Sequence, residues 1–199
     1  RVLVSAVEHH AVVDSAEWLA AHEGAEVELL EVDRFGRVGP ETLRAALERD
    51  PASAALVSVM WANNEVGTVN PIRELAAVAH EFDVPFHTDA VQAVGILPVD
   101  FGASGVDALT LTGHKLGGPY GAGVLLLGRE VAVTPLLHGG GQERDVRSGT
   151  LDTPSVIGLA TAVEIAVADT ARRAATVGAL RDELVARVTA AVPDAMLNG

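Results

Sequence analysis

Short apolar runs alternate with longer amphipathic segments through most of the chain. Six runs predict strands, at residues 2–7, 26–32, 54–60, 84–88, 108–112 and 123–127. The segments between them predict helices at residues 11–22, 40–49 and 71–82, where apolar residues recur at helical spacing. Strands that alternate with helices favour an α/β fold with a mostly parallel sheet covered by helices.

The carboxy-terminal part has a different pattern. Residues 154–192 are almost continuously helical in pattern, which is long for one globular helix, so a break near Gly178 is expected. Residues 196–198 are expected to begin another strand, and no terminal domain is completed after them. We therefore expect the chain to be a piece of a longer protein.

Charge and composition exclude several classes of function. The formal net charge of −13 leaves no basic stripe for phosphate backbones, so no nucleic-acid partner is expected. No apolar run reaches the ~18 residues of a membrane span. The chain has no cysteine, which excludes disulfides and thiolate metal sites and fits a cytoplasmic protein.

Two residues at the ends of predicted strands could act together. Lys115 follows the apolar run 106–111 and precedes two glycines and a proline, and Asp89 ends the run 84–88. Alone, the lysine could be a surface charge and the aspartate a helix N-cap. A lysine that can form a Schiff base and an aspartate that can pair with a pyridinium nitrogen are what pyridoxal 5'-phosphate (PLP) chemistry needs. The pair therefore predicts a PLP site.

Other polar residues also follow strands. Gln92 and Asn64 could contact the phenolic oxygen of the cofactor, although adjacent asparagines are more often turn formers. His9 could stack on a planar cofactor or simply begin a helix at the surface. No set of ligands at metal-binding spacing surrounds the paired histidines, so no metal site is predicted. The glycines of residues 139–141 are only weak evidence for a phosphate loop.

Taken together, the motifs occur in the order found in cysteine desulfurases, which are class V aminotransferase-like enzymes of PLP fold type I. The motifs are Glu8-His9, Asn63-Asn64-Glu65-Val66-Gly67, Asp89 with Gln92, Thr112-Gly113-His114-Lys115, and His138 to Gly141 with Arg147-Ser148-Gly149-Thr150. The resemblance covers essentially the whole chain. It implies a PLP-binding large domain at residues 1–165, incomplete at its start, followed at 166–199 by a connecting helix and the start of a small domain.

The resemblance also implies a role for each site residue. Lys115 resembles the Schiff-base lysine, and Asp89 the partner of the pyridine nitrogen. Gln92 and Asn64 would contact the phenolic oxygen, and His9 would stack on the ring and could serve as a base. The cofactor phosphate would be bound within the Thr112-Gly113-His114 turn, where the family usually has serine at the first position. Thr150 resembles a residue that reaches the phosphate of a neighbouring subunit, which implies a homodimer.

The implied reaction converts L-cysteine to L-alanine and passes sulfur, as an enzyme persulfide, to an acceptor such as an iron–sulfur scaffold protein or a tRNA-thiolation system. The chain departs from the family pattern because it has no cysteine to take up the sulfur. It also lacks the amino-terminal Gly-Thr loop and the arginine that binds the substrate carboxylate, so the chain alone is expected to be inactive. The alternatives are a selenocysteine lyase, a class V aminotransferase, or a non-catalytic scaffold with a PLP fold.

Overall fold

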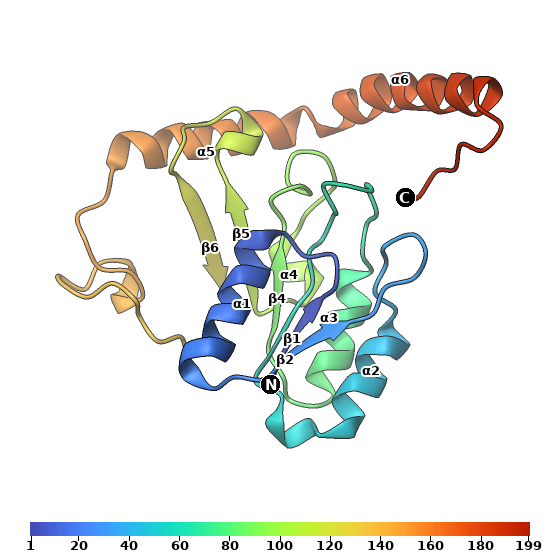
Figure 1. Ribbon diagram of the computed structural model, residues 1–199. Helices are drawn as coiled ribbons and strands as arrows, with labels where there is room; N and C mark the ends of the chain where they lie inside the picture. Colours follow the sequence, from blue (N-terminus) through green and yellow to red (C-terminus); the bar gives the residue numbers. More distant parts are fainter.

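A six-stranded sheet forms the centre of the molecule (Figure 1). The structure is a computed structural model that describes residues 1–199. The strands are β1 (Val2–Ser5), β2 (Val27–Leu30), β3 (Leu56–Ser58), β4 (Phe86–Asp89), β5 (Ala108–Thr112) and β6 (Gly123–Leu127), arranged in the order β2-β1-β3-β4-β5-β6. The first five strands are parallel and β6 pairs antiparallel with β5. This arrangement confirms the predicted α/β fold.

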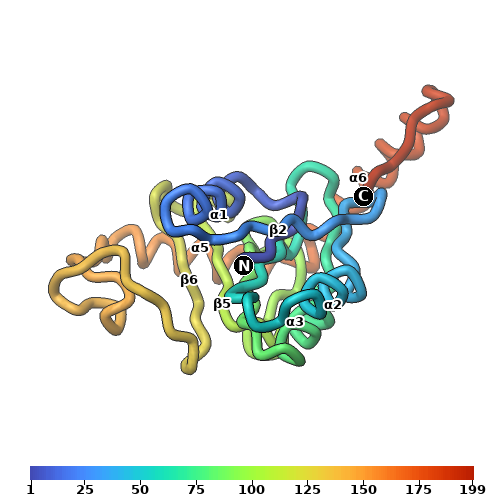
Figure 2. The backbone as a smooth tube through the Cα atoms, turned by 60° about the horizontal axis from the view of Figure 1, so that its bottom comes forward, coloured from blue at the N-terminus to red at the C-terminus, as the bar shows by residue number.

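Helices cover both faces of the sheet. The elements are α1 (His10–Glu23), α2 (Pro40–Arg49), α3 (Ile72–His80) and the short α4 (Phe101–Ser104), with 3-10 turns η1 (Pro51–Ser53), η2 (His114–Leu116) and η3 (Glu143–Asp145). The chain moves from β1 to β2 in one direction across the sheet and then returns past β1 to β3. Since such crossovers are right-handed, α1 lies on one face and α2 and α3 lie on the other (Figure 2).

The core lies mainly between the sheet and the α2–α3 face. Helix α3 buries five apolar residues at helical spacing, whereas α1 buries only Ala16. The most deeply buried large side chains of the core include Leu3, Leu30, Leu43, Leu47, Val57, Leu75, Phe86 and Leu109. The predicted apolar runs supply this core. The packed sheet therefore fixes the positions of the residues that follow the carboxyl ends of its strands.

The strand ends differ from prediction where apolar residues continue into loops. The bounds of α2, β5 and β6 match the prediction, but β1 and β3 end earlier, at Ser5 and Ser58. Val59 and Met60 are nevertheless buried. Their apolar character therefore marks a buried loop at the end of the sheet rather than more strand.

The helical carboxy-terminal part breaks at Asp169, so the expected break near Gly178 is wrong. Helices α5 (Thr153–Ala168) and α6 (Thr170–Ala191) meet there at an angle of 63°. The Asp169 carboxylate accepts two hydrogen bonds from the Arg172 guanidinium, each of 2.6 Å, which link the junction to the first turn of α6. A mid-helix glycine costs only ~1 kcal/mol, so Gly178 is tolerated inside α6.

Helix α6 projects away from the sheet and buries no residue (Figure 1). Residues 196–198, expected to begin a strand, form no regular structure, and they pair with no strand of the sheet. No single helix is long and apolar enough to cross a membrane; only the bent pair of α5 and α6 reaches the required length and composition together.

Candidate active site

The predicted site residues follow the carboxyl ends of the parallel strands. His9 follows β1, Asn64 follows β3, Asp89 ends β4, and Lys115 follows β5. Parallel strands place these ends at the same edge of the sheet, which is where ligands bind in open α/β sheets. Helix α5 crosses this edge beyond β5 (Figure 1) and packs on the turn η2.

Asp89 is buried at this edge, with 7% of the residue exposed. Its Oδ1 accepts a hydrogen bond of 2.8 Å from the Val91 N–H, and its backbone carbonyl accepts one of 2.8 Å from the Trp61 N–H. Asp89 therefore caps a turn. No α-helix begins directly after it, so the alternative that Asp89 is a helix N-cap is wrong. The half-buried Gln92 lies in the same turn.

His9 begins α1. Its exposed ring accepts a hydrogen bond at Nδ1 from the Ala11 N–H, at 3.1 Å, which makes it the N-cap of the helix. The helix-start alternative is therefore realised in this structure. Capping through Nδ1 puts the proton of the neutral ring on Nε2 and leaves that nitrogen for another partner.

Lys115 is the only lysine in the chain, and its side chain is exposed in the η2 turn. Thr112 Oγ1 lies 3.0 Å from His114 Nδ1, so a hydroxyl and an imidazole lie together beside that turn. Gly113 between them is buried, and a Cβ there would lie 3.0 Å from the Pro119 carbonyl oxygen. Any larger residue at this position would force the turn to shift, so Gly113 allows the close approach of the two backbone segments.

The two adjacent asparagines are placed differently. Asn63 is buried, and its Oδ1 accepts hydrogen bonds of 2.8 Å from the N–H groups of Glu65 and Val66. Asn64 is exposed, and its amide donates to Glu65 Oε1 at 2.9 Å. Asn63 therefore shapes the loop, while Asn64 is the amide left at the surface.

Sequence reasoning missed Glu8 as a site residue. Its Oε1 accepts a hydrogen bond from the Met60 N–H, and its Oε2 is buried without any hydrogen-bond partner. Burial, opposed by the Met60 hydrogen bond and reinforced by the nearby Asp89, raises the pKa of Glu8 to about 8. The sequence signals were its position after an apolar strand and its place in the Glu8-His9 motif, neither of which indicates that the carboxyl is buried.

His87 was also missed. It precedes Asp89 by two residues on β4, so both side chains lie on the same face of the sheet. Burial lowers the pKa of His87 below 6.5, although Asp89 acts in the opposite direction. The ring is therefore uncharged at neutral pH. His87, which the sequence predicted only as part of a strand, therefore belongs to the polar surroundings of Asp89.

Thr150 lies apart from these residues within the chain. It is exposed at the end of a long segment between β6 and α5, whose only regular element is η3. This segment forms a loop beside β6, away from the turn after β5 (Figures 1 and 2). The buried Ser148 and the glycines order it locally, through hydrogen bonds such as Gly149 N–H to Gln142 Oε1 at 2.8 Å.

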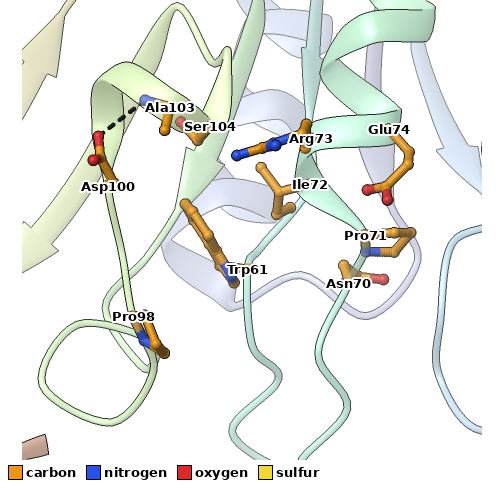
Figure 3. Close-up of a pocket in the computed structure, with 10 residues that line it drawn as sticks. All are labelled: Trp61, Asn70, Pro71, Ile72, Arg73, Glu74, Pro98, Asp100, Ala103 and Ser104. Atoms are coloured by element: carbon orange, nitrogen blue, oxygen red, sulfur yellow. Dashed lines mark hydrogen bonds between the residues drawn. The ribbon is translucent and has the colours of Figure 1, made fainter.

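A hollow of about 250 Å³ lies elsewhere, between the start of α3 and α4 (Figure 3). Its lining includes Trp61, Arg73 and Asp100, but none of the predicted site residues. Asp100 uses its carboxylate to cap α4 through the Ala103 N–H, at 2.9 Å. No group of three His, Asp or Glu side chains is placed to hold a metal ion.

The sequence profile of the aminotransferase class-V family matches residues 1–196. The chain is 55% identical to an IscS-like cysteine desulfurase from Mycobacterium tuberculosis, over 100% of this chain and 50% of that protein. It is 46% identical to the cysteine desulfurase NifS of Azotobacter vinelandii, over 100% of this chain and 48% of that protein. The chain thus spans about half the length of these curated relatives.

Solved structures agree with this assignment. A NifS-like protein superposes with a TM-score of 0.88 at 35% identity, covering 95% of this chain and 52% of that one. DndA from Streptomyces lividans superposes with a TM-score of 0.83 at 36% identity, covering 94% of this chain and 53% of that one. By sequence and by fold, the chain belongs to the aminotransferase class-V family.

Proposed function

We propose that the protein containing this chain is a PLP-dependent cysteine desulfurase. The observation that carries the proposal is the placement of Asp89 at the end of β4 and of Lys115 just after the neighbouring strand β5, at one edge of the sheet. Relatives named cysteine desulfurase, such as the M. tuberculosis protein, support the same reaction. The substrate is L-cysteine, and the sulfur leaves as a persulfide for an acceptor such as an iron–sulfur scaffold protein.

The residues at this edge fit PLP. Asp89 offers a buried carboxylate, of which only Oδ1 is used by the protein, to the pyridine nitrogen. Lys115 offers the only lysine amine to the aldehyde, and the paired Thr112 and His114 offer a hydroxyl and an imidazole to the phosphate. His9 offers a ring with a free Nε2. Gln92 and Asn64 are assigned to the phenolic oxygen, and the Gly113 backbone to the phosphate turn.

PLP, when bound, supplies an electron sink for the negative charge that develops at the α-carbon of the substrate. The chain supplies the groups around it. Asp89 keeps a proton on the pyridine nitrogen, which strengthens this electron withdrawal. The amine of Lys115 can take and return protons at the substrate carbons, and the Nε2–H of His9, which carries the proton of the neutral ring, can donate one. In these assignments Asp89 supplies the negative charge, and Lys115 and His9 transfer protons.

The sulfur-accepting thiol must come from outside these residues, because the chain contains no cysteine. The Cβ–S bond of L-cysteine breaks, the thiolate forms the persulfide with the departing sulfur, and the bonding electrons and a proton remain on the carbon as L-alanine. We infer that residues 1–199 alone are inactive. We also infer a division into a PLP-binding domain at 1–165 and a connecting helix with the start of a second domain at 166–199.

A homodimer is part of the proposal. Thr150 stands at the end of a long exposed loop, away from the other phosphate-binding candidates, so it could serve the site of a second subunit. Exposed Leu136 and Leu137 in the same loop would be buried by such contact. We place the protein in the cytoplasm, where thiols stay reduced, and expect no direct nucleic-acid or membrane partner.

The test is to express the complete protein and to measure alanine and sulfide formed from L-cysteine in the presence of a reducing thiol. Equal amounts of alanine and sulfide are expected, together with the visible absorbance of bound PLP. Selenocysteine and amino-acid/keto-acid pairs serve as competing substrates. Turnover of selenocysteine alone would indicate a selenocysteine lyase, and transamination alone would indicate a class V aminotransferase. A colourless protein would indicate a non-catalytic scaffold.

A further inference from the structure

Two side chains tie the segment after β1 to the segment after β3. The Asn63 Nδ2 donates a hydrogen bond of 2.8 Å to the Val7 carbonyl, and Glu8 Oε1 accepts one from the Met60 N–H. The Met60 carbonyl accepts in turn from Asn70 Nδ2, at 2.8 Å. Both backbone groups of the buried Met60 are therefore satisfied by side chains. Removing the Glu8 carboxyl would leave the Met60 N–H unpaired, a loss that buried donors do not tolerate well.

The second oxygen of Glu8 makes the residue unusual. Oε2 is buried and has no hydrogen-bond partner within the chain. A carboxylate in this place would bury a negative charge close to that of Asp89 and without a cation to balance it. His87, on the same face of β4 as Asp89, is uncharged at neutral pH and supplies no positive charge to balance it. An added proton on Glu8 removes both penalties, in keeping with the raised pKa.

We propose that Glu8 is a positioning residue which, as an uncharged carboxylic acid, fastens the segment carrying His9 to the end of β3 and leaves Asp89 as the only carboxylate facing the cofactor. This inference rests on the proposed function, because it assigns Glu8 a task at the PLP site. His9 follows Glu8 directly, so an anchor at Glu8 limits where the imidazole can lie. The single positive charge of the pyridinium nitrogen is then balanced by the single negative charge of Asp89.

The experiment compares Glu8→Gln and Glu8→Ala in the complete PLP-loaded protein. Glutamine keeps an acceptor for the Met60 N–H and carries no charge, whereas alanine removes both oxygens. Glu8→Gln is expected to retain a PLP dissociation constant within threefold of the wild type. Glu8→Ala is expected to weaken PLP binding at least tenfold and to shift the pH midpoint of the PLP absorbance. Glu17→Gln and Glu17→Ala, at an exposed position of α1, are the matched controls and should change neither quantity.

Protonation of Glu8 is tested separately in the PLP-free protein, by urea unfolding between pH 5 and 8. The folded protein holds the Glu8 proton up to about pH 8 while the unfolded chain releases it near 4.5, so wild-type stability should fall across this range. Glu8→Gln should remove that part of the slope, and Glu17→Gln should leave it. An unchanged slope in Glu8→Gln would overturn the uncharged state.

Two further outcomes would overturn the positioning role. In the first, Glu8→Gln weakens PLP binding as strongly as Glu8→Ala, which would show that the charge is needed. In the second, Glu8→Ala lowers only the unfolding free energy and leaves PLP affinity and absorbance unchanged. A wild-type protein that binds no PLP would instead refute the proposed function, and the unfolding comparison would still report whether Glu8 is protonated.

Discussion

Ser58 and His87 face each other on the adjacent parallel strands β3 and β4, with Ser58 Oγ 2.8 Å from His87 Nδ1. On the other side of the ring, His87 Nε2 lies 3.2 Å from Thr110 Oγ1 on β5. A neutral imidazole has one donor and one acceptor nitrogen, and hydroxyls can serve either. This polar row therefore joins three strands on the same face of β4 as Asp89, without adding a charge.

Acid should destabilise the protein in part through His87. Its folded pKa is lowered below 6.5 by burial, so the unfolded state binds the proton more readily. The stability from the neutral ring is present above pH 6.5 and is lost as pH falls below that value. His87→Gln should flatten this loss, measured by urea unfolding at about pH 7.5 and 5.5. The exposed His22→Gln is the control, and equal pH dependence in both variants would contradict the assignment.

Lys115 should be the attachment point of PLP. Borohydride reduction of the complete protein should fix the cofactor to the peptide containing Lys115, the only lysine within residues 1–199. Lys115→Ala should abolish the visible absorbance and lower turnover of L-cysteine by about 10²–10⁴-fold, since a proton-transferring group is lost. Arg129→Ala, which removes an exposed cation, should leave both unchanged. Cofactor trapped on a lysine outside this chain would refute the assignment.

Particular residues show which features of the fold and of the site could be predicted from the sequence. Apolar runs predicted every strand, and apolar residues at helical spacing predicted the bounds of α2, because these signals are local. The break at Asp169 leaves no mark in the apolar periodicity, which continues through both helices. Glu8 and His87 were missed because their burial results from strands brought together in three dimensions. The sequence shows which polar residues follow strands but not which of them become buried.

Asn63 and Asn64 are adjacent in the sequence, but only Asn63 is buried, so their substitutions should differ in their effect on stability. Asn63→Ala removes four hydrogen bonds of a buried side chain: its Nδ2 donates to the Val7 carbonyl and to Met60 Sδ, and its Oδ1 accepts from the N–H groups of Glu65 and Val66. We expect a loss of about 3 kcal/mol in the free energy of unfolding. Asn64→Ala, at an exposed position, should change it by less than ~0.5 kcal/mol. Weaker PLP binding in Asn64→Ala without loss of stability would support its cofactor role, and equal stability losses would contradict the structure.

Gly113 should be the most sensitive glycine of the site. A Cβ there would lie 3.0 Å from the Pro119 carbonyl oxygen and 3.1 Å from Leu159 Cδ1 on α5, so Gly113→Ala must push the turn and the helix apart. Such overpacking should cost roughly 1–3 kcal/mol.

Gly178→Ala is the matched change, because a Cβ in that part of α6 meets open space, and it should stabilise the protein by roughly 0.5–1 kcal/mol. Thermal unfolding of both variants and PLP titration check the pair. Since the Gly113 turn carries Lys115, Gly113→Ala should also weaken PLP binding, whereas Gly178→Ala should not. Normal cofactor affinity in a destabilised Gly113→Ala would show that the turn does not position Lys115.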